Sequence, residues 1–268
     1  MKKISFQGEH GAYSESSAKK FFKNDIETVP CLTFHQVLEQ VQSGNLDFAI
    51  LPVENSIEGS VGQSYDAIFS SNLNAIGEIY LPIHHCLIGN GNIDEITTVY
   101  SHPQALGQCR NFIEENSLKT VPTYDTAGSV KIIKELDDKS TAAIASQNAA
   151  DIYSMPIIRE NIENEKNNIT RFLVFSKQQT EPTSNDKTSI IFSIKHEPGA
   201  LHEIIKEFFD NNINLTKIES RPKKGTSWEY NFYLDFVGHV SDEKISYLLD
   251  NLKTVSYTHL TLPTNREV

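Results

Sequence analysis

Five junctions in the first two-thirds of the chain carry small, hydroxyl or amide side chains directly after a predicted strand. These segments are GEHGAYSE from Gly8, ENSIEGSV from Glu54, SHPQAL from Ser101, YDTAGSV from Tyr124 and SQNA from Ser146. Each one leads into a predicted helix, whose first N–H groups and dipole favour an anion. Any single junction is also explained by Ser, Thr, Asn or Asp capping a helix. Five junctions of one character favour a binding site for a small anion.

Two further pairs of polar side chains have a spacing that suits chemistry. Gln104 and Gln108 stand four residues apart on a predicted helix, so their amides lie on one face. Facing a cleft, such amides hydrogen-bond carboxylate or hydroxyl groups; the alternative is a solvated helix face. Glu54 and Glu58 flank a helix start, where they act as an acid/base pair or only compensate the helix dipole.

The sequence lacks the patterns of a metal or nucleotide site. The adjacent His84 and His85 point to opposite faces of a strand, and no carboxylate or cysteine stands nearby at ligand spacing. The segment GEHGAYS lacks the lysine of a phosphate-binding loop, and no G-x-G-x-x-G motif follows a strand. We therefore expect neither a metal nor another cofactor.

Composition places the chain among soluble globular proteins. It has 268 residues, of which 38% are hydrophobic and 22% charged, and a net charge of −11 with scattered lysines. This charge argues against nucleic acid as a partner. The N-terminus has no apolar core of signal-peptide length, and no run is long enough to span a membrane. Cys31, Cys86 and Cys109 show no paired spacing, so we expect reduced thiols in a cytoplasmic protein.

Strand and helix patterns alternate through residues 1–178. Apolar runs such as LDFAILPV and TAAIAS read as strands, Thr33 with Gln36 reads as the capping box of a helix, and one helix is expected from Pro103 to Asn116. Such β-α alternation favours parallel sheets with helices on both faces. Because 178 residues exceed one small sheet, we expect two α/β lobes with a cleft between them.

The remaining sequence predicts a second, smaller domain. Residues 179–187 are polar and without periodicity, which is typical of a linker. Residues 188–255 show the order βαββα, which lacks only a last strand of a ferredoxin-like βαββαβ domain. The segment VSYTHLTLPTNREV can supply that strand, but its sudden threonine-rich composition is foreign to the chain. We therefore regard residues 256–268 as a tail of doubtful origin, with read-through of a sequencing adapter as one explanation.

At these junctions the sequence closely resembles the prephenate dehydratase family. The matching segments are FQGEHGAYSE, PVENSIEGSV, SHPQALGQC, YDTAGS and NNITRFLV, in the expected order. Behind them, GALHEII and LTKIESRP resemble the ACT domain that responds to phenylalanine. The resemblance covers residues 1 to about 254 and implies a two-lobed catalytic part like a type II periplasmic binding protein, in residues 1–178. It also implies that prephenate loses CO2 and hydroxide to become phenylpyruvate on the route to L-phenylalanine.

The resemblance implies that Thr170 is central to catalysis, together with Arg171, Asn55 and Gln108. It also implies that the cleft is lined by Ser56, Ser101, Gln104, Thr126 and Phe172. Prephenate carries two carboxylates and a ring hydroxyl, and its products are aromatic, so the protein needs to hold a dianion and help the hydroxyl leave. The rigid donor fork of Arg171 suits a carboxylate, and the Thr170 hydroxyl suits the departing oxygen. Without the motif, Thr170 is only a β-branched residue at a strand start.

For the ACT domain of residues 188–255, the resemblance implies allosteric binding of L-phenylalanine across a subunit interface. The residues at the matching positions are Gly199, Ala200, Leu201, Asn214, Leu215, Glu219 and Ser220. It also implies a homodimer or homotetramer; a domain that only dimerises is the alternative. Two other functions stay open: arogenate dehydratase, which acts on the amino-acid analogue of prephenate, and a non-catalytic sensor of small anions.

Overall fold

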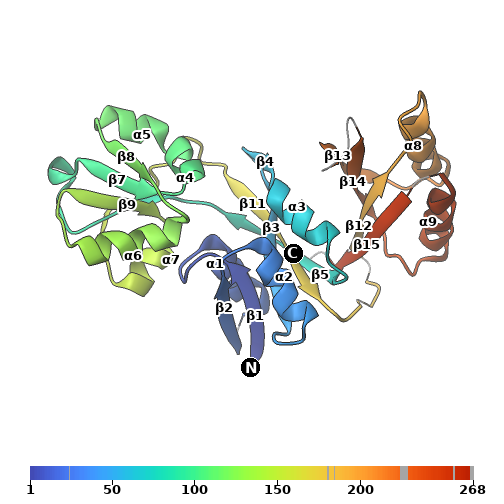
Figure 1. Cartoon of the computed structure of the whole chain (residues 1–268), viewed down its shortest axis with the longest axis horizontal. Helices are drawn as coiled ribbons and strands as arrows, with labels where there is room; N and C mark the ends of the chain where they lie inside the picture. Colours follow the sequence, from blue (N-terminus) through green and yellow to red (C-terminus); the bar gives the residue numbers. More distant parts are fainter. Residues whose placement is uncertain (24, 180, 184, 224–228, 256, 266–268) are drawn as a thin grey trace. The chain divides into compact units, whose positions relative to one another are not determined.

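The computed structural model describes the chain except residues 24, 180, 184, 224–228, 256 and 266–268. The contacts divide the chain into two compact units (Figure 1). The first unit contains Met1–Tyr65 and Ile79–Phe172, and the second contains Asp66–Glu78 and Leu173–Val268. No helix in the described part of the chain is both long and apolar enough to cross a bilayer.

The first sheet follows the order β2-β1-β3-β11-β5, and the short β4 pairs with β3. Its strands are β1 (Lys2–Gln7), β2 (Ile26–Cys31), β3 (Phe48–Asn55), β4 (Gly59–Ser60), β5 (Asn74–Pro82) and β11 (Ile169–Ser176). The helices between them are α1 (Tyr13–Phe22), α2 (Phe34–Gln42) and α3 (Gly62–Phe69). Strand β1 runs parallel to both β2 and β3. The Thr33 side chain accepts from Gln36 N at the start of α2, so that predicted cap is confirmed.

The second sheet follows the order β10-β6-β9-β7-β8. Its strands are β6 (Cys86–Ile88), β7 (Thr98–Ser101), β8 (Lys119–Pro122), β9 (Thr141–Ala145) and β10 (Ile157–Arg159). Its helices are η1 (Ile93–Glu95), α4 (Pro103–Gln108), α5 (Arg110–Glu115), α6 (Thr126–Leu136) and α7 (Gln147–Tyr153). In Figure 1, α4 and α5 lie on one side of this sheet and α6 and α7 on the other.

Two features differ from the sequence-based expectation for this region. Both sheets are mixed rather than purely parallel, because β4 runs antiparallel to β3, β6 to β9 and β10 to β6. The helix expected from Pro103 to Asn116 is two helices, because Cys109 leaves the helical conformation with φ −108° and ψ 19°. The two α/β sheets with helices on both faces are otherwise as predicted.

The third sheet belongs to the second unit and has the order β13-β14-β12-β15. Its elements are β12 (Asp186–Ser193), α8 (Ala200–Asp210), β13 (Leu215–Pro222), β14 (Tyr230–Val237), α9 (Glu243–Val255) and β15 (Tyr257–Asn265). This βαββαβ order with antiparallel neighbours is the predicted ferredoxin-like arrangement, with α8 and α9 on one face of the sheet (Figure 1). Residues 257–265 thus form the last strand; the doubt about the origin of residues 256–268 stays a prediction.

Candidate active site

The first unit contains a cavity of about 640 Å³, within the range of about 300–1,000 Å³ that small-molecule sites occupy. Its wall combines the loop after β1, the end of β3 and the start of β11 with residues of α4 and α6 from the second sheet. The cavity therefore lies where strands of both sheets end and helices begin, which is the usual place for a ligand in an open α/β sheet.

Six of the nine residues assigned to the catalytic site line this cavity. They are Asn55, Gln104, Gln108, Thr126, Thr170 and Phe172. Ser101, Ser56 and Arg171 do not line it. Ser101 is buried within the second sheet, where its hydroxyl donates to Ile144 O at 2.6 Å. Ser56 donates to Asn167 O at 3.1 Å and accepts from Ile169 N at 2.9 Å, so it fastens the start of β11.

Strand alternation explains why Thr170 and Arg171 do not lie together. Successive side chains of β11 point to opposite faces, so Thr170 and Phe172 reach the cavity while Arg171 lies on the other side. Arg171 is buried, and its Nη1 lies 3.9 Å from Glu54 Oε2. Its contact with a substrate carboxylate stays a prediction, one that this placement does not favour.

Asn55 is fixed at the end of β3 by the backbone that follows it. Its Oδ1 accepts from the N–H groups of Ile57 and Glu58, each at 3.0 Å, and its Nδ2 therefore faces β11. Nδ2 donates to Thr170 Oγ1 at 2.9 Å and to Asn168 Oδ1 at 2.6 Å. The Thr170 oxygen is thus an acceptor from the protein, and no described residue accepts its proton.

Further buried polar side chains continue from Asn168 along the cavity wall. Asn168 Nδ2 donates to Gln108 Oε1 at 3.1 Å, and the same oxygen lies 2.9 Å from His85 Nε2. The other ring nitrogen of His85 lies 3.0 Å from the Tyr13 hydroxyl, which donates to His84 O at 2.6 Å. These bonds connect Tyr13 on α1 to Thr170 on β11.

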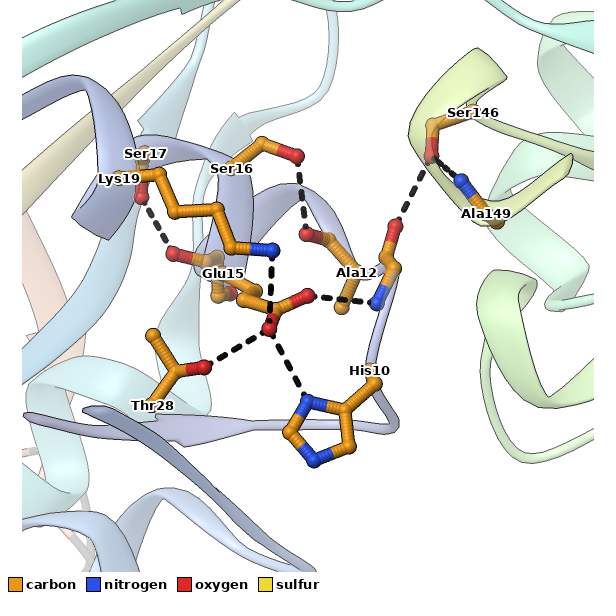
Figure 2. A network of polar contacts seen from close by, with 11 residues as sticks. His10, Ala12, Glu15, Ser16, Ser17, Lys19, Thr28, Ser146 and Ala149 are labelled. Carbon is orange, nitrogen blue, oxygen red and sulfur yellow. Dashed lines mark hydrogen bonds and ion pairs between the residues drawn. The ribbon is translucent and has the colours of Figure 1, made fainter. Parts of the chain in front are cut away.

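The loop that presents Tyr13 is held by the carboxylate of Glu15 (Figure 2). Glu15 Oε2 accepts from Gly11 N at 2.7 Å, and Oε1 lies within hydrogen-bond distance of His10, Thr28 and Lys19. Burial alone would raise the pKa of Glu15, but these hydrogen bonds outweigh it and lower the pKa. The carboxylate is therefore charged and fixes the shape of the loop.

Contacts from the second sheet hold the same loop from the other side. The Ser146 hydroxyl donates to Gly11 O at 2.9 Å (Figure 2), and Glu9 N donates to Asp125 Oδ2 at 2.9 Å. Gly11 has φ +96°, and a Cβ there would lie 2.8 Å from the Ala149 Cα, so this close approach needs glycine. Burial raises the pKa of Asp125, while the amides of Gly128 and Glu9 act in the opposite direction.

The ionisable side chains of the cavity wall limit the donors that the wall offers to an anion. Of the described residues that line it, none is Lys or Arg, and the ionisable side chains are Asp125, His85, His102, Tyr13 and Tyr124. Helix α1 begins in the wall at Tyr13, and its first N–H groups have no side-chain cap. Amides and a helix N-terminus, rather than cations, are therefore the donors available to a carboxylate. Among the described residues, no cluster of three or more His, Cys, Asp or Glu suits a metal ion.

Among the side chains that sequence reasoning missed, Tyr13, His85 and Asp125 line the cavity, and Asn168 donates to Gln108. Tyr13, Asp125 and Asn168 stand inside the quoted motifs, and Asp125 directly precedes the assigned Thr126, so the motifs themselves marked the right segments. In the sequence, His85 stands out only as a candidate metal ligand. Its burial, which decides its role, has no signature in the sequence.

The residues assigned to phenylalanine binding lie at two places in the second unit. Gly199 precedes α8 with φ +90°, and Ala200 and Leu201 form the first turn of that helix. Asn214 accepts from Val237 N through its carbonyl oxygen at 3.0 Å, just before β13, which contains Leu215, Glu219 and Ser220. Within this unit, the Glu219 carboxylate lies 3.5 Å from Lys217 Nζ.

Comparison with known proteins identifies the family of this chain. The prephenate dehydratase family model matches residues 4–180, and the ACT domain model matches residues 188–246. A prephenate dehydratase of Methanocaldococcus jannaschii is 42% identical over 251 residues, which cover 91% of this chain and 90% of the relative. An arogenate dehydratase/prephenate dehydratase of Arabidopsis thaliana is 39% identical over 264 residues, covering 94% of this chain and 69% of the relative.

A solved structure has the same fold over nearly the whole chain. It is the crystal structure of a prephenate dehydratase from Arthrobacter aurescens in complex with L-Phe, with a TM-score of 0.87 and 30% identity. The match covers 97% of this chain and 89% of that one. The chain accordingly belongs to the prephenate dehydratase family, as a dehydratase domain, a carbon–oxygen lyase, followed by a C-terminal ACT domain.

Proposed function

We propose that the cavity of the first unit binds prephenate and that Thr170 assists the departure of its ring hydroxyl. One observation carries this assignment. Because Asn55 is locked by two backbone N–H groups, its amide nitrogen must donate to Thr170 Oγ1, so the Thr170 proton is directed elsewhere. Thr170 lines the cavity and no described residue accepts that proton, so the substrate oxygen is its available acceptor.

The reaction needs little from the protein beyond positioning and hydrogen bonding. The bond between the ring and its carboxylate breaks, and CO2 leaves while the electron pair enters the ring. The C–O bond to the hydroxyl breaks in turn, and the oxygen leaves with its bonding pair and takes one proton from solvent to become water. The ring becomes aromatic, and this supplies the driving force. Thr170 donates a hydrogen bond to the oxygen as its negative charge develops.

Hydrogen-bond donors of the wall account for binding of the two carboxylates. The amides of Gln104 and Gln108 and the uncapped start of α1 at Tyr13 face the cavity. Their partial charges suit an anion without burying a full positive charge. Arg171, which lies behind β11 near Glu54, supports the strand from its other face.

The test compares Thr170→Ala with Thr170→Ser in the release of phenylpyruvate from prephenate. Removing one preorganised donor typically lowers kcat by about 10²–10³, so Thr170→Ala should lose that much while Thr170→Ser keeps most of the rate. Near-full turnover by Thr170→Ala would refute the role. Absence of turnover by the unaltered chain would favour a non-catalytic anion sensor.

Arogenate is a second candidate substrate, because the wall contains the Asp125 carboxylate. A carboxylate can accept from the substrate ammonium that arogenate has in place of the keto group. The Arabidopsis relative bears both activities in its name. Initial rates with prephenate and arogenate, measured side by side for the unaltered chain and for Asp125→Asn, decide between them: if Asp125 binds the ammonium, the substitution lowers kcat/KM for arogenate more than for prephenate.

The second unit is proposed to bind L-phenylalanine and to regulate the dehydratase. The residues proposed for binding are Gly199, Ala200, Leu201, Asn214, Leu215, Glu219 and Ser220. The relative from Arthrobacter aurescens was solved with L-Phe, and a helix N-terminus such as that of α8 suits the carboxylate of an amino acid. Calorimetry should show binding of phenylalanine, and the dehydratase rate should change with it. A homodimer or homotetramer is proposed with it, which light scattering after size exclusion tests. If phenylalanine neither binds nor changes the rate, the domain only assembles subunits.

A further inference from the structure

A hydrogen-bond network runs from Tyr13 and His85 to Thr170. It passes through Gln108, Asn168 and Asn55. His85 is buried, and its Nε2 lies 2.9 Å from Gln108 Oε1. Its Nδ1 lies 3.0 Å from the hydroxyl of Tyr13. Both residues line the cavity. Each side chain of this network donates one hydrogen bond and accepts another, so fixing the direction of one bond fixes the direction of the next.

The direction is set at Asn55. Only an oxygen can accept from the N–H groups of Ile57 and Glu58, so Asn55 Oδ1 faces that turn and its Nδ2 faces β11. Nδ2 must then donate to Asn168, which meets it with Oδ1 at 2.6 Å. The amide of Asn168 is thereby oriented as well, with its Nδ2 toward Gln108.

The same reasoning assigns the proton of His85. Asn168 Nδ2 donates to Gln108, so the atom of Gln108 that it meets is the oxygen Oε1. Since that oxygen is an acceptor, the His85 Nε2 that lies 2.9 Å away must carry a proton and donate it. Two bonds therefore hold Gln108 Oε1, and no described residue accepts from the Gln108 amide nitrogen.

We propose that His85 is a positioning residue: as the Nε2–H imidazole, held by Tyr13, it locks the Gln108 amide so that its NH2 group faces the substrate. Gln108 then donates to a carboxylate or keto oxygen of the substrate and offers it no acceptor. This inference rests on the proposed function of the cavity and names the group that recognises one substrate oxygen. Thr170 and Gln108 become two donors of fixed direction in one wall.

The surroundings of His85 agree with a neutral ring. Burial lowers the pKa of His85, while the bond to Gln108 and the charge of Glu163 act in the opposite direction. Burial raises the pKa of Tyr13 well above its usual value, so its hydroxyl keeps its proton. That proton has two acceptors, His84 O at 2.6 Å and His85 Nδ1 at 3.0 Å. A neutral ring with its proton on Nε2 donates to Gln108, and its bare Nδ1 competes with His84 O for the single Tyr13 proton.

Three variants test the role in turnover. His85→Leu removes the donor to Gln108 and should lower kcat/KM for prephenate by on the order of tenfold, mostly through KM. His85→Gln restores an N–H donor and should stay within about threefold of the unaltered chain. The matched control is His84→Gln at the adjacent, half-exposed ring, which should leave kcat/KM unchanged within about twofold. Equal losses in His85→Leu and His85→Gln would overturn the proposal.

A double-mutant cycle separates positioning from general disruption. If His85 acts through Gln108, His85→Leu should cause no further loss of kcat/KM in the Gln108→Leu background. A tenfold loss in both backgrounds would contradict the proposal. A failure of the proposed function is distinguishable, because the unaltered chain would then not turn over prephenate.

The tautomer is measured on the unaltered chain, and a variant is needed only to assign the His85 signal. Nitrogen-15 spectra of the histidine rings distinguish a proton on Nε2 from one on Nδ1, and the signal of His85 is the one absent from His85→Gln. We expect a neutral ring protonated at Nε2. A ring protonated at Nδ1 alone would overturn the direction assigned to the hydrogen bonds of the whole network.

Discussion

The wall of the cavity buries amides, an imidazole and a hydroxyl, whereas the helix-covered side of the third sheet buries phenylalanine, leucine and isoleucine. In the wall, Asn55, Gln108 and Thr170 each have a hydrogen-bond partner that fixes their direction. In the third sheet, side chains such as Phe208 and Leu248 are held only by packing. Hydrogen bonds are directional but add little net stability, while apolar burial has no direction but adds much. The wall is therefore suited to orient a substrate and the apolar cluster to hold a fold together.

The largest change in stability is expected from Phe208→Ala in the apolar cluster. Phe208 is 1% exposed and its ring lies 5.1 Å from that of Phe236, so truncation leaves a cavity. The free energy of unfolding of the second unit should fall by about 3–5 kcal/mol, as measured by denaturant titration. The next residue is the control: Phe209 is 80% exposed, and Phe209→Ala should change it by less than about 0.5 kcal/mol. Similar losses for both would show that the cluster does not support this unit.

Removing a buried ion pair in the second unit tests whether a polar contact can stabilise the fold as much as a side chain of the apolar cluster does. Lys187 Nζ lies 2.9 Å and 3.2 Å from the two carboxylate oxygens of Glu78, which is fully buried. Glu78→Gln leaves the Lys187 charge without its partner and should cost about 3 kcal/mol. The exposed pair Lys253–Asp250 is the control, and Lys253→Ala should cost less than about 0.5 kcal/mol in the same titration. Equal costs would mean that water reaches Glu78 freely.

The Glu15 carboxylate makes the free energy of unfolding depend on pH. Its folded-state pKa is lowered below the value of about 4.3 for an unfolded chain, so the ionised form stabilises the fold. This stability is present above that value and is lost as the pH falls through the lowered folded-state pKa. Glu15→Gln should lower the unfolding free energy by about 1–3 kcal/mol at pH 7 and flatten its decline below about pH 5.

The measurement for Glu15 is a series of denaturant titrations between neutral and acidic pH. Asp138 provides a comparison, since hydrogen bonds from Ser140 also lower its pKa although it is fully exposed. Because solvent screens an exposed carboxylate, Asp138→Asn should flatten the decline at acidic pH much less than Glu15→Gln does. A Glu15→Gln variant whose stability falls with pH as steeply as that of the unaltered chain would show that the loop is not held by this charge.

The sequence predicted elements and motifs better than it predicted contacts. Periodicity and capping residues such as Thr33 mark elements because these signals are local. The direction of a strand relative to its neighbours is not a local property. Strand β6 runs antiparallel to both β9 and β10, and no local sequence pattern predicts this. The pairing of Tyr13 with His85 joins residues 72 positions apart, so only the fold reveals it.

The assignment of Arg171 to the substrate shows a different limit. Thr170 and Arg171 were grouped because they are adjacent in a motif, yet alternation along a strand separates them. Alternation follows from the sequence, but it does not say which face of β11 meets the cavity. Both faces of β11 are buried, so burial does not distinguish them. Burial on both faces is decided by the neighbouring strands and helices.

The smallest effect is expected from Ser56→Ala. This variant tests whether Ser56 only stabilises the start of β11 or also binds the substrate. Ser56 is exposed, lies outside the cavity lining and accepts from Ile169 N at 2.9 Å, one residue before Thr170. Losing this bond should cost about 0.5–1.5 kcal/mol of stability and leave KM for prephenate within about twofold, because the substrate loses no donor. Gln104→Ala is the comparison within the lining and should raise KM more. A rise in KM for Ser56→Ala as large as that for Gln104→Ala would instead favour direct contact between Ser56 and the substrate, and the wall would then extend beyond the residues that line the cavity.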